Sequence, residues 1–158
     1  MKHENFMKLA IVQAMTAQEK GEVPAGCVIV FTGTNGKLPK GSIIGRAHNQ
    51  VELLKDPTAH AEMIAITQAA SALGDWRLAN TALYVTKEPC AMCAGAIVLA
   101  RIPTVVFGTP DPQRGGAVSV FSILNHPKLN HRCKIISGVL EDECLALLKD
   151  FFKNRRKK

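Results

Sequence analysis

The sequence predicts an α/β fold, because short apolar runs rich in β-branched residues alternate with longer segments of helical periodicity. Two further observations narrow the class. At 158 residues the chain is long enough to bury one core, and no composition shift or linker divides it, so we expect a single domain over residues 1–158. No apolar run approaches the ~18 residues that a membrane-spanning helix needs.

The N-terminal third predicts a helix followed by a β-hairpin. Apolar residues recur at helical intervals over residues 6–20. Residues 27–31 form a continuous apolar run that is typical of a buried strand, and residues 42–47 can pair with it. The connection at 32–41 contains three glycines, an Asn-Gly pair and a proline, and is longer than a minimal turn.

The rest of the chain predicts helices and strands in alternation. We expect a helix at about 59–73 capped by Thr58, a strand at 82–86, a helix at 90–100, strands at 104–107 and 133–136, and a final helix at 141–155. The βαβαβ order predicts parallel neighbouring strands, because a helical crossover usually joins such strands.

Three residues have the types and the spacing of a zinc site. Cys90 and Cys93 lie three residues apart at the expected start of a helix, so both thiols face one side of its first turn. His60 adds a nitrogen ligand, and a catalytic zinc site holds three protein ligands while leaving the fourth position to water. We therefore predict one Zn²⁺ per subunit on these residues.

Glu62 is the predicted catalytic residue. It follows His60 by two positions at the start of the same helix, so the two side chains point in different directions. Beside a metal-bound water, its carboxylate can accept a proton and deliver protons to a ring nitrogen and a leaving amine. Either motif alone is often structural, but together they favour a catalytic zinc site.

The remaining cysteines and the N-terminus bear on the compartment. Five cysteines, an odd number, fit metal ligation better than a disulfide framework, and Cys27, Cys133 and Cys144 lie in or beside apolar segments where core thiols are common. The N-terminal residues lack the continuous apolar core of a signal peptide. We expect a cytoplasmic protein.

The positive charge is concentrated at the C-terminus. The chain has 20 Lys and Arg against 13 Asp and Glu, a formal net charge of +7. Five basic residues crowd the tail at 153–158, directly after Phe151 and Phe152. Such a tail is a candidate phosphate-binding element, although a frayed solvated terminus has the same composition.

Seven segments carry a likeness to a known family: Glu-Val-Pro-Ala-Gly at 22–26, Pro-Thr-Ala-His-Ala-Glu at 57–62, Leu-Tyr-Val-Thr at 83–86, Glu-Pro-Cys-Ala-Met-Cys-Ala-Gly-Ala at 88–96, Val-Val-Phe-Gly at 105–108, Asn-His-Arg at 130–132, and Asp-Phe-Phe at 150–152 with its basic tail. With them the chain resembles the cytidine deaminase-like superfamily and, more narrowly, the bacterial tRNA adenosine deaminases. The metal motif indicates only the superfamily, whereas the last two segments favour the tRNA enzymes.

The resemblance implies a three-layer α/β/α cytidine deaminase-like fold with a five-stranded mixed sheet, a homodimer, and a tRNA anticodon stem-loop as the partner. It implies hydrolytic conversion of the wobble adenosine of an arginine tRNA to inosine. By matching position, the substrate would be held by Asn49 at the flipped adenine, the backbone near Ala61 at the attacking oxygen, Asp111 at the anticodon loop, and Phe152 and Arg155 at its bases or phosphates.

Two alternatives stay open. A deaminase of a free base or nucleoside, of the guanine or cytosine type, would use the same metal site but would have no need of the basic tail. A non-catalytic, zinc-stabilised RNA-binding module would need a fourth ligand rather than Glu62. The sequence also departs from the family pattern at Val118, where a glycine is usual, and at Lys87, where an apolar residue is common.

Overall fold

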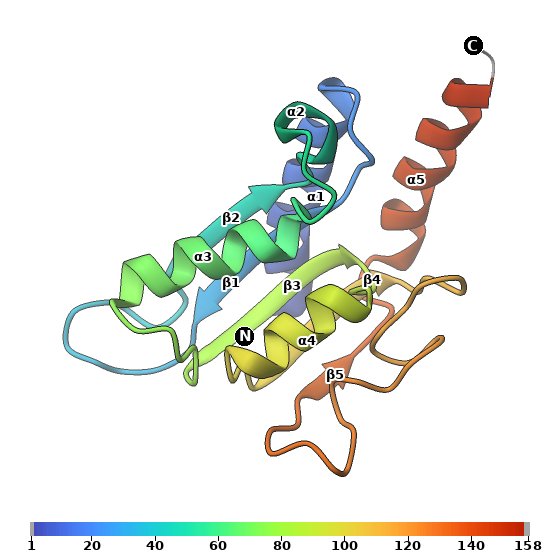
Figure 1. Cartoon of the computed structure of the whole chain (residues 1–158). Helices are drawn as coiled ribbons and strands as arrows, with labels where there is room; N and C mark the ends of the chain where they lie inside the picture. The colour runs from blue at the N-terminus through green and yellow to red at the C-terminus, as the bar shows by residue number, and fades with distance from the viewer. Residues whose placement is uncertain (1, 157–158) are drawn as a thin grey trace.

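The structure is a computed structural model that describes residues 2–156 (Figure 1). Its elements in chain order are α1 (His3–Glu19), β1 (Gly26–Phe31), β2 (Ile43–His48), α2 (Val51–Leu54), α3 (Ala61–Leu73), β3 (Thr81–Lys87), α4 (Ala91–Leu99), β4 (Thr104–Thr109), β5 (Lys134–Ile136) and α5 (Glu141–Arg156). Among the helices of the described residues, none combines the length and apolar character that crossing a membrane requires.

The sheet is five-stranded and mixed, as the resemblance implies. The strand order is β2-β1-β3-β4-β5, with β1 antiparallel to both of its neighbours and β3, β4 and β5 parallel. The prediction that all strands joined by helices are parallel neighbours is wrong at one place. β2 and β3 point the same way but are not adjacent, because β1 pairs with both and every one of its residues is buried.

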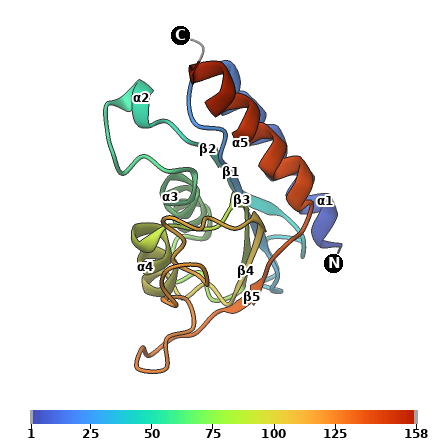
Figure 2. The same ribbon diagram turned by 90° about the vertical axis from the view of Figure 1, so that its right-hand side faces the viewer.

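Helices cover both faces of the sheet and give three layers (Figure 2). Alternate residues of β1 point to opposite faces, as the strand repeat requires. Cys27, Ile29 and Phe31 belong to the core beneath α3 and α4, whereas Val28 and Val30 belong to the core beneath α1 and α5. The α/β/α fold class is thereby confirmed.

Two glycines let the helices approach the sheet closely. A Cβ added to Gly26 of β1 would lie 2.0 Å from the carbonyl oxygen of Ala10 in α1. A Cβ added to Gly45 of β2 would lie 2.6 Å from the carbonyl oxygen of Ala65 in α3. Since such separations are far inside van der Waals contact, a side chain at either position would push a helix away from the sheet.

The segment between β2 and α3 differs from the prediction. α3 begins at Ala61 with His60 as its N-cap residue, so the prediction that Thr58 caps it is wrong. The backbone N–H and the hydroxyl of Thr58 instead donate to the Asp56 carboxylate at 2.8 and 2.7 Å, which closes a local turn. The short helix α2 has no counterpart in the sequence prediction, because four residues are too few to show helical periodicity.

Candidate active site

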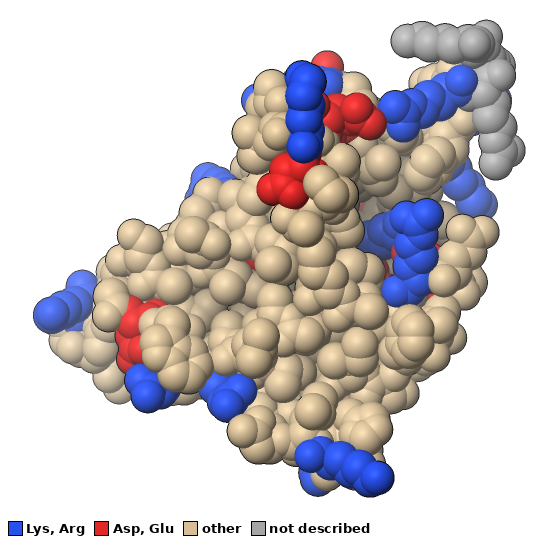
Figure 3. Space-filling model, viewed as in Figure 1, with Lys and Arg blue, Asp and Glu red and all other residues tan. Residues whose placement is uncertain are grey.

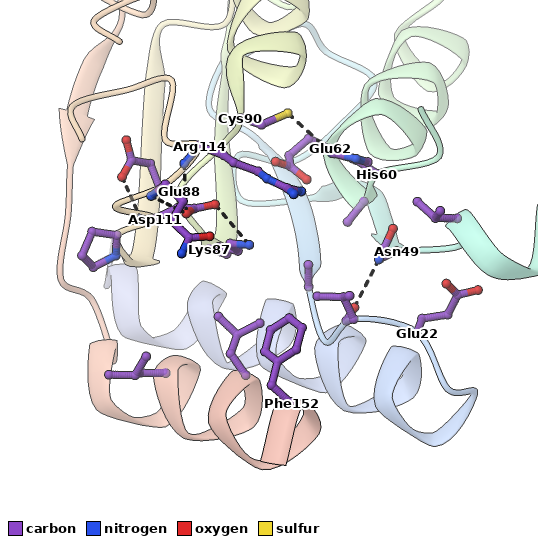
Figure 4. A pocket seen from close by; sticks show the side chains of 18 of the residues that line it. Glu22, Asn49, His60, Glu62, Lys87, Glu88, Cys90, Asp111, Arg114 and Phe152 are labelled. Carbon is purple, nitrogen blue, oxygen red and sulfur yellow. Dashed lines mark hydrogen bonds and ion pairs between the residues drawn. The ribbon is translucent and has the colours of Figure 1, made fainter. Parts of the chain in front are cut away.

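A pocket of about 810 Å³ lies at the edge of the sheet where β2, β3 and β4 end (Figure 4). These three strands point the same way, so the segments that follow them meet at this edge. Its wall includes residues from the ends of β2 and β3, the N-termini of α3 and α4, the loop after β4 and the last turns of α5: Asn49, His60, Glu62, Lys87, Glu88, Cys90, Asp111, Arg114, Phe152 and Arg155. Residues far apart in the sequence thus converge on one cavity.

The structure brings the three predicted zinc ligands together. His60 Nδ1 lies 3.6 Å from Cys90 Sγ and 3.5 Å from Cys93 Sγ, and all three donor atoms lie within 4.8 Å of one another. Tetrahedral zinc with bonds of about 2.3 Å to sulfur and 2.0–2.1 Å to nitrogen would separate a sulfur from the nitrogen by about 3.6 Å. The donor types and their spacing therefore fit a zinc ion.

Helix N-termini hold these ligands in an electropositive setting. His60 is the N-cap residue of α3, Cys90 is the N-cap residue of α4, and Cys93 lies in the first turn of α4. The hydrogen bond with Cys93 lowers the pKa of the Cys90 thiol, with His60 adding to the effect, while the same bond and burial raise the pKa of Cys93. One of the two thiols therefore ionises readily, which suits a metal site.

Glu62 lies on the first turn of α3 with its side chain almost fully buried at the pocket wall. Burial raises the pKa of its carboxyl group, while the neighbouring His60 opposes the shift. A carboxyl group whose pKa lies above its ordinary range is better suited to both accept and return protons near neutral pH. Ala61, between these two residues, is fully buried and its segment borders the same cavity.

Asn49 points its side chain into the pocket from the end of β2. Its backbone N–H donates to Ala25 O at 3.0 Å, and its side-chain Nδ2 donates to Val23 O at 3.4 Å (Figure 4). Its Oδ1 is buried and has no hydrogen-bond partner among the described residues. An unpaired buried acceptor is costly to the free protein and is available to a ligand that donates a hydrogen bond.

Asp111 lies after β4 and is engaged through both oxygens. Oδ1 accepts the backbone N–H groups of Gln113 and Arg114 at 3.1 and 3.2 Å, and Oδ2 pairs with Lys87 Nζ at 3.1 Å. The lysine that departs from the family pattern therefore neutralises a carboxylate at the pocket wall. The resemblance implied that Asp111 lies at the anticodon loop, but it did not pair this residue with Lys87.

Two buried glutamates at the pocket were missed by the sequence prediction. Glu22, just before β1, accepts the N–H groups of Glu52 and Leu53 at 2.9 and 2.8 Å and so holds α2 in place. Glu88, just after β3, accepts N–H groups from the loop that follows β4. The sequence held no signal for either, since a glutamate beside an apolar segment has the same pattern whether it is buried or exposed.

The two phenylalanines of α5 have different environments. Phe151 is buried, whereas Phe152 is 42% exposed and lies at the pocket wall. Arg155 stacks over the Phe151 ring at 5.1 Å and lies 3.8 Å from the Glu52 carboxylate. The end of α5 thus places the Phe152 ring and the Arg155 guanidinium at the rim. Lys157 and Lys158 of the predicted basic tail lie outside the described residues.

The other candidates have structural surroundings. Cys27, Cys133 and Cys144 are buried free thiols that do not belong to the metal-ligating group. His131, in the Asn-His-Arg segment, makes a hydrogen bond of 2.7 Å between Nε2 and the carbonyl oxygen of Ile102, which ties the segment before β5 to the segment before β4.

Comparisons with known proteins agree with this geometry. The sequence model of the MafB19-like deaminases matches residues 1–156. The chain is 48% identical to a tRNA-specific adenosine deaminase of Bacillus subtilis (strain 168), over 98% of this chain and 91% of the relative. It is 51% identical to a tRNA-specific adenosine deaminase of Aquifex aeolicus (strain VF5), over 99% of this chain and 97% of the relative.

A solved structure gives the same indication. The chain superposes on a solved structure with a TM-score of 0.83 and 41% sequence identity. That structure comes from biochemical and structural studies of A-to-I editing by tRNA:A34 deaminases at the wobble position of transfer RNA. The superposition covers 91% of this chain and 99% of that protein. The likeness therefore extends over the sheet, the helices and the pocket between them.

Proposed function

Since the chain belongs to the tRNA-specific adenosine deaminases, within the MafB19-like deaminases, we propose that it hydrolyses the wobble adenosine of an arginine tRNA anticodon to inosine. Water replaces the amino group at C6 of the adenine, and ammonia leaves. The observation that carries the proposal is the buried Glu62 beside the His60, Cys90 and Cys93 group, in a pocket rimmed by an aromatic ring and cations.

We propose that His60, Cys90 and Cys93 hold one Zn²⁺ per subunit, because their donor types and separations match tetrahedral zinc. Bound zinc supplies Lewis acidity, which lowers the pKa of a coordinated water. Three ligands from protein leave a fourth position open, as a catalytic site requires.

Glu62 moves the protons of the reaction. Its carboxylate accepts a proton from the attacking water and delivers one to N1 of the adenine ring. It then transfers a second proton from the added oxygen to the amino group, which leaves as ammonia. Its burial at the pocket wall keeps bulk water from exchanging those protons. The backbone near Ala61 orients the attacking oxygen.

Asn49 holds the adenine in place. Its buried Oδ1 accepts a hydrogen bond from the base, which gives an otherwise unpaired atom a partner. An adenine must leave its stack to enter such a pocket, and unstacking costs least in a single-stranded loop. An anticodon loop is therefore a more suitable substrate than a duplex.

The rim binds the rest of the anticodon stem-loop. Phe152 offers a ring on which a neighbouring base can stack, and Arg155 and Asp111 contact the loop. Figure 3 shows Lys and Arg side chains at the upper right of this face, where Figure 1 places α5 and the loop after β4. Together with the net charge of +7, they favour a polyanionic substrate over a free base.

We further propose that residues 1–158 act as a single deaminase domain, as a homodimer, in the cytoplasm where tRNA is found. Exposed apolar side chains on α4 and the loop after β4 are consistent with a second copy, Leu99 and Phe121 being 69% and 51% exposed. Sedimentation equilibrium tests the dimer, and a mass of one chain at micromolar concentration would contradict it.

One assay tests the proposed reaction against its alternatives. The protein is incubated with an arginine tRNA anticodon stem-loop and, separately, with adenosine, guanine and cytidine. Inosine at the wobble position, with no product from the small molecules, is expected. Product from a free base would favour the alternative deaminase, and no product in the presence of full zinc occupancy would favour a binding module.

A further inference from the structure

Glu88 is a buried carboxylate whose hydrogen bonds all reach one distant loop. Oε1 accepts the backbone N–H of Asp111 at 3.0 Å and the hydroxyl of Ser119. Oε2 accepts the backbone N–H groups of Ala117, Val118 and Ser119 at 3.1, 2.9 and 2.9 Å. Five donors thus come from residues 111–119, which we call the β4 loop.

The same stretch of chain that carries Glu88 also carries a zinc ligand. Gly116 N donates to Pro89 O at 2.7 Å, and Cys90 forms an isolated antiparallel bridge with Gly115. Residues 88–90 therefore bind the β4 loop through side chain and backbone together. The loop is held at its start, Asp111, and again from Gly115 onward.

Between these two attachments the loop faces the pocket. Residues 112–114 are exposed, so little packing fixes them. Asp111 and Arg114 both border the cavity, and Figure 4 shows Arg114 extending across it. Their position relative to Cys90 consequently depends on the attachments to residues 88–90.

We propose that Glu88 is a positioning residue that holds the β4 loop against the metal-ligating segment, so that Asp111 and Arg114 meet the RNA at a set distance from the reacting adenine. This inference rests on the proposed function, because it takes an anticodon loop as the ligand of the rim. Although Glu88 borders the pocket, every hydrogen bond of its carboxylate goes to the β4 loop, so it acts through the loop.

The hydrogen bonds of Glu88 favour a role in positioning the β4 loop over a role in stabilising the core as a whole. A carboxylate that has left water needs several donors, and those of Glu88 lie 23 to 31 residues away in the sequence on this loop. Loss of its charge would leave N–H groups unpaired in the loop, while the sheet keeps its strand pairing. Damage should therefore be local.

Kinetics on the anticodon stem-loop test the role. Glu88→Gln places an amide group against N–H donors, so we expect KM to rise at least tenfold, kcat to fall less than threefold, and zinc content to stay at one per chain. Glu88→Asp, which keeps the charge, should recover part of the KM. Glu19→Gln, an exposed control on α1, should match the wild type. An unchanged KM, or a loss confined to kcat, would overturn the inference.

Limited proteolysis tests the loop without any activity. Arg114 is exposed, but the attachments of Asp111 and of residues 117–119 to Glu88 keep the flanking chain from extending into a protease site. Glu88→Gln should therefore speed tryptic cleavage after Arg114 at least tenfold, while cleavage after Lys37 stays the same. Equal rates after Arg114 would overturn the inference. If the wild type converts no stem-loop, the proposed function fails while this measurement still decides the role of Glu88.

A milder variant guards against misfolding. Ser119→Ala removes one of the five donors from an exposed residue, so the fold should survive even if that of Glu88→Gln does not. We expect an intermediate rise in cleavage after Arg114 and an intermediate rise in KM. A Ser119→Ala protein indistinguishable from the wild type in both measurements would contradict the proposal.

Discussion

Lys87 and Asp111 form an ion pair at the wall of the pocket, with Nζ 3.1 Å from Oδ2 and side-chain exposures of 29% and 10%. The pair joins the end of β3 to the loop after β4. It neutralises the Asp111 carboxylate at a part of the pocket wall that a phosphate backbone would approach. The pair therefore has an electrostatic consequence for RNA binding.

Lys87→Met should weaken RNA binding, because Asp111 would then repel the phosphates. We expect KM to rise about fivefold at low salt, which corresponds to about 1 kcal/mol, and the effect to shrink as salt screens the charge. Asp111→Asn in the Lys87→Met background should reverse part of the loss. A double-mutant cycle on KM measures the coupling, and strictly additive effects would show that the pair is irrelevant to binding.

Glu62→Gln should abolish turnover while leaving the fold and the metal in place. The amide keeps the shape of the side chain but cannot accept a proton, so we expect kcat to fall roughly 10²- to 10⁴-fold. Glu62→Ala should behave alike. Atomic absorption measures whether zinc is retained, and nuclease digestion of the RNA measures how much inosine is formed. A variant that retains turnover would remove Glu62 from the mechanism.

The zinc group was predictable because its signal is local. Cys90 and Cys93 share one helical turn, and His60 and Glu62 share another, so spacing alone oriented them. The strand and helix positions followed from periodicity in the same way. What periodicity could not show is which strands become neighbours, since the position of β1 between β2 and β3 depends on pairing across the sheet.

The missed residues depend on hydrogen bonds between distant segments. Glu88 meets its donors 23 to 31 residues away, and Glu22 meets Glu52 and Leu53 about as far along the chain. Neither has a spacing that distinguishes it from an exposed glutamate. The Asn49 site came from the family resemblance, and the structure adds its buried unpaired oxygen, which no sequence pattern contains.

Chelation should make one thiol reactive and leave the other four protected. With zinc bound, we expect slow alkylation of all five cysteines. After chelation, we expect labelling at Cys90, which is partly exposed and has a lowered pKa, and none at Cys93, which is fully buried. Burial raises the pKa of Cys133 to about 11 and of Cys144 to about 12, so both stay protonated and unreactive at pH 8. Peptide mass spectrometry locates the labels. Equal labelling with and without chelator would contradict the metal site.

The buried thiols of Cys133 and Cys144 predict a loss of stability in alkali. Their ordinary pKa is 9.0, and the native thiols bind their protons more tightly than the unfolded ones. The unfolding free energy should therefore be unaffected by them below pH 8 and fall as the pH rises above 9. Urea unfolding of Cys144→Ala should show a shallower decline between pH 9 and 11, and an unaltered slope would contradict the shift.

Removal of the basic tail should flatten the salt dependence of RNA binding. Truncation after Phe152 deletes five basic residues, and each phosphate that is no longer neutralised lowers the slope of log K against log salt by about 0.7 on a single strand. Arg155→Gln alone should lower it by about that amount. Lys37→Gln, on the exposed β1–β2 connection, is the matched control. An unchanged slope would show that the tail is a solvated terminus that does not bind phosphates.

Asn49→Leu should change stability and activity in opposite directions. The buried Oδ1 of Asn49 has no partner among the described residues, and Val23 O keeps the N–H of Ala25 at 2.8 Å when the weak bond from Nδ2 is removed. Replacing the amide with an apolar group should therefore raise the unfolding free energy by about 1 kcal/mol, while kcat/KM falls because the adenine loses its acceptor.

Asn35→Leu is the control with the reverse pattern. The Asn35 Oδ1 accepts the N–H groups of Lys37 and Leu38, both at 2.9 Å, in a loop away from the pocket. Its removal should lower the unfolding free energy and leave kcat/KM unchanged. Urea denaturation measures the unfolding free energy of both variants, and stem-loop kinetics measure their kcat/KM. If Asn49→Leu instead destabilises the protein as Asn35→Leu does, the Asn49 oxygen is satisfied in the free protein and is not held ready for the base.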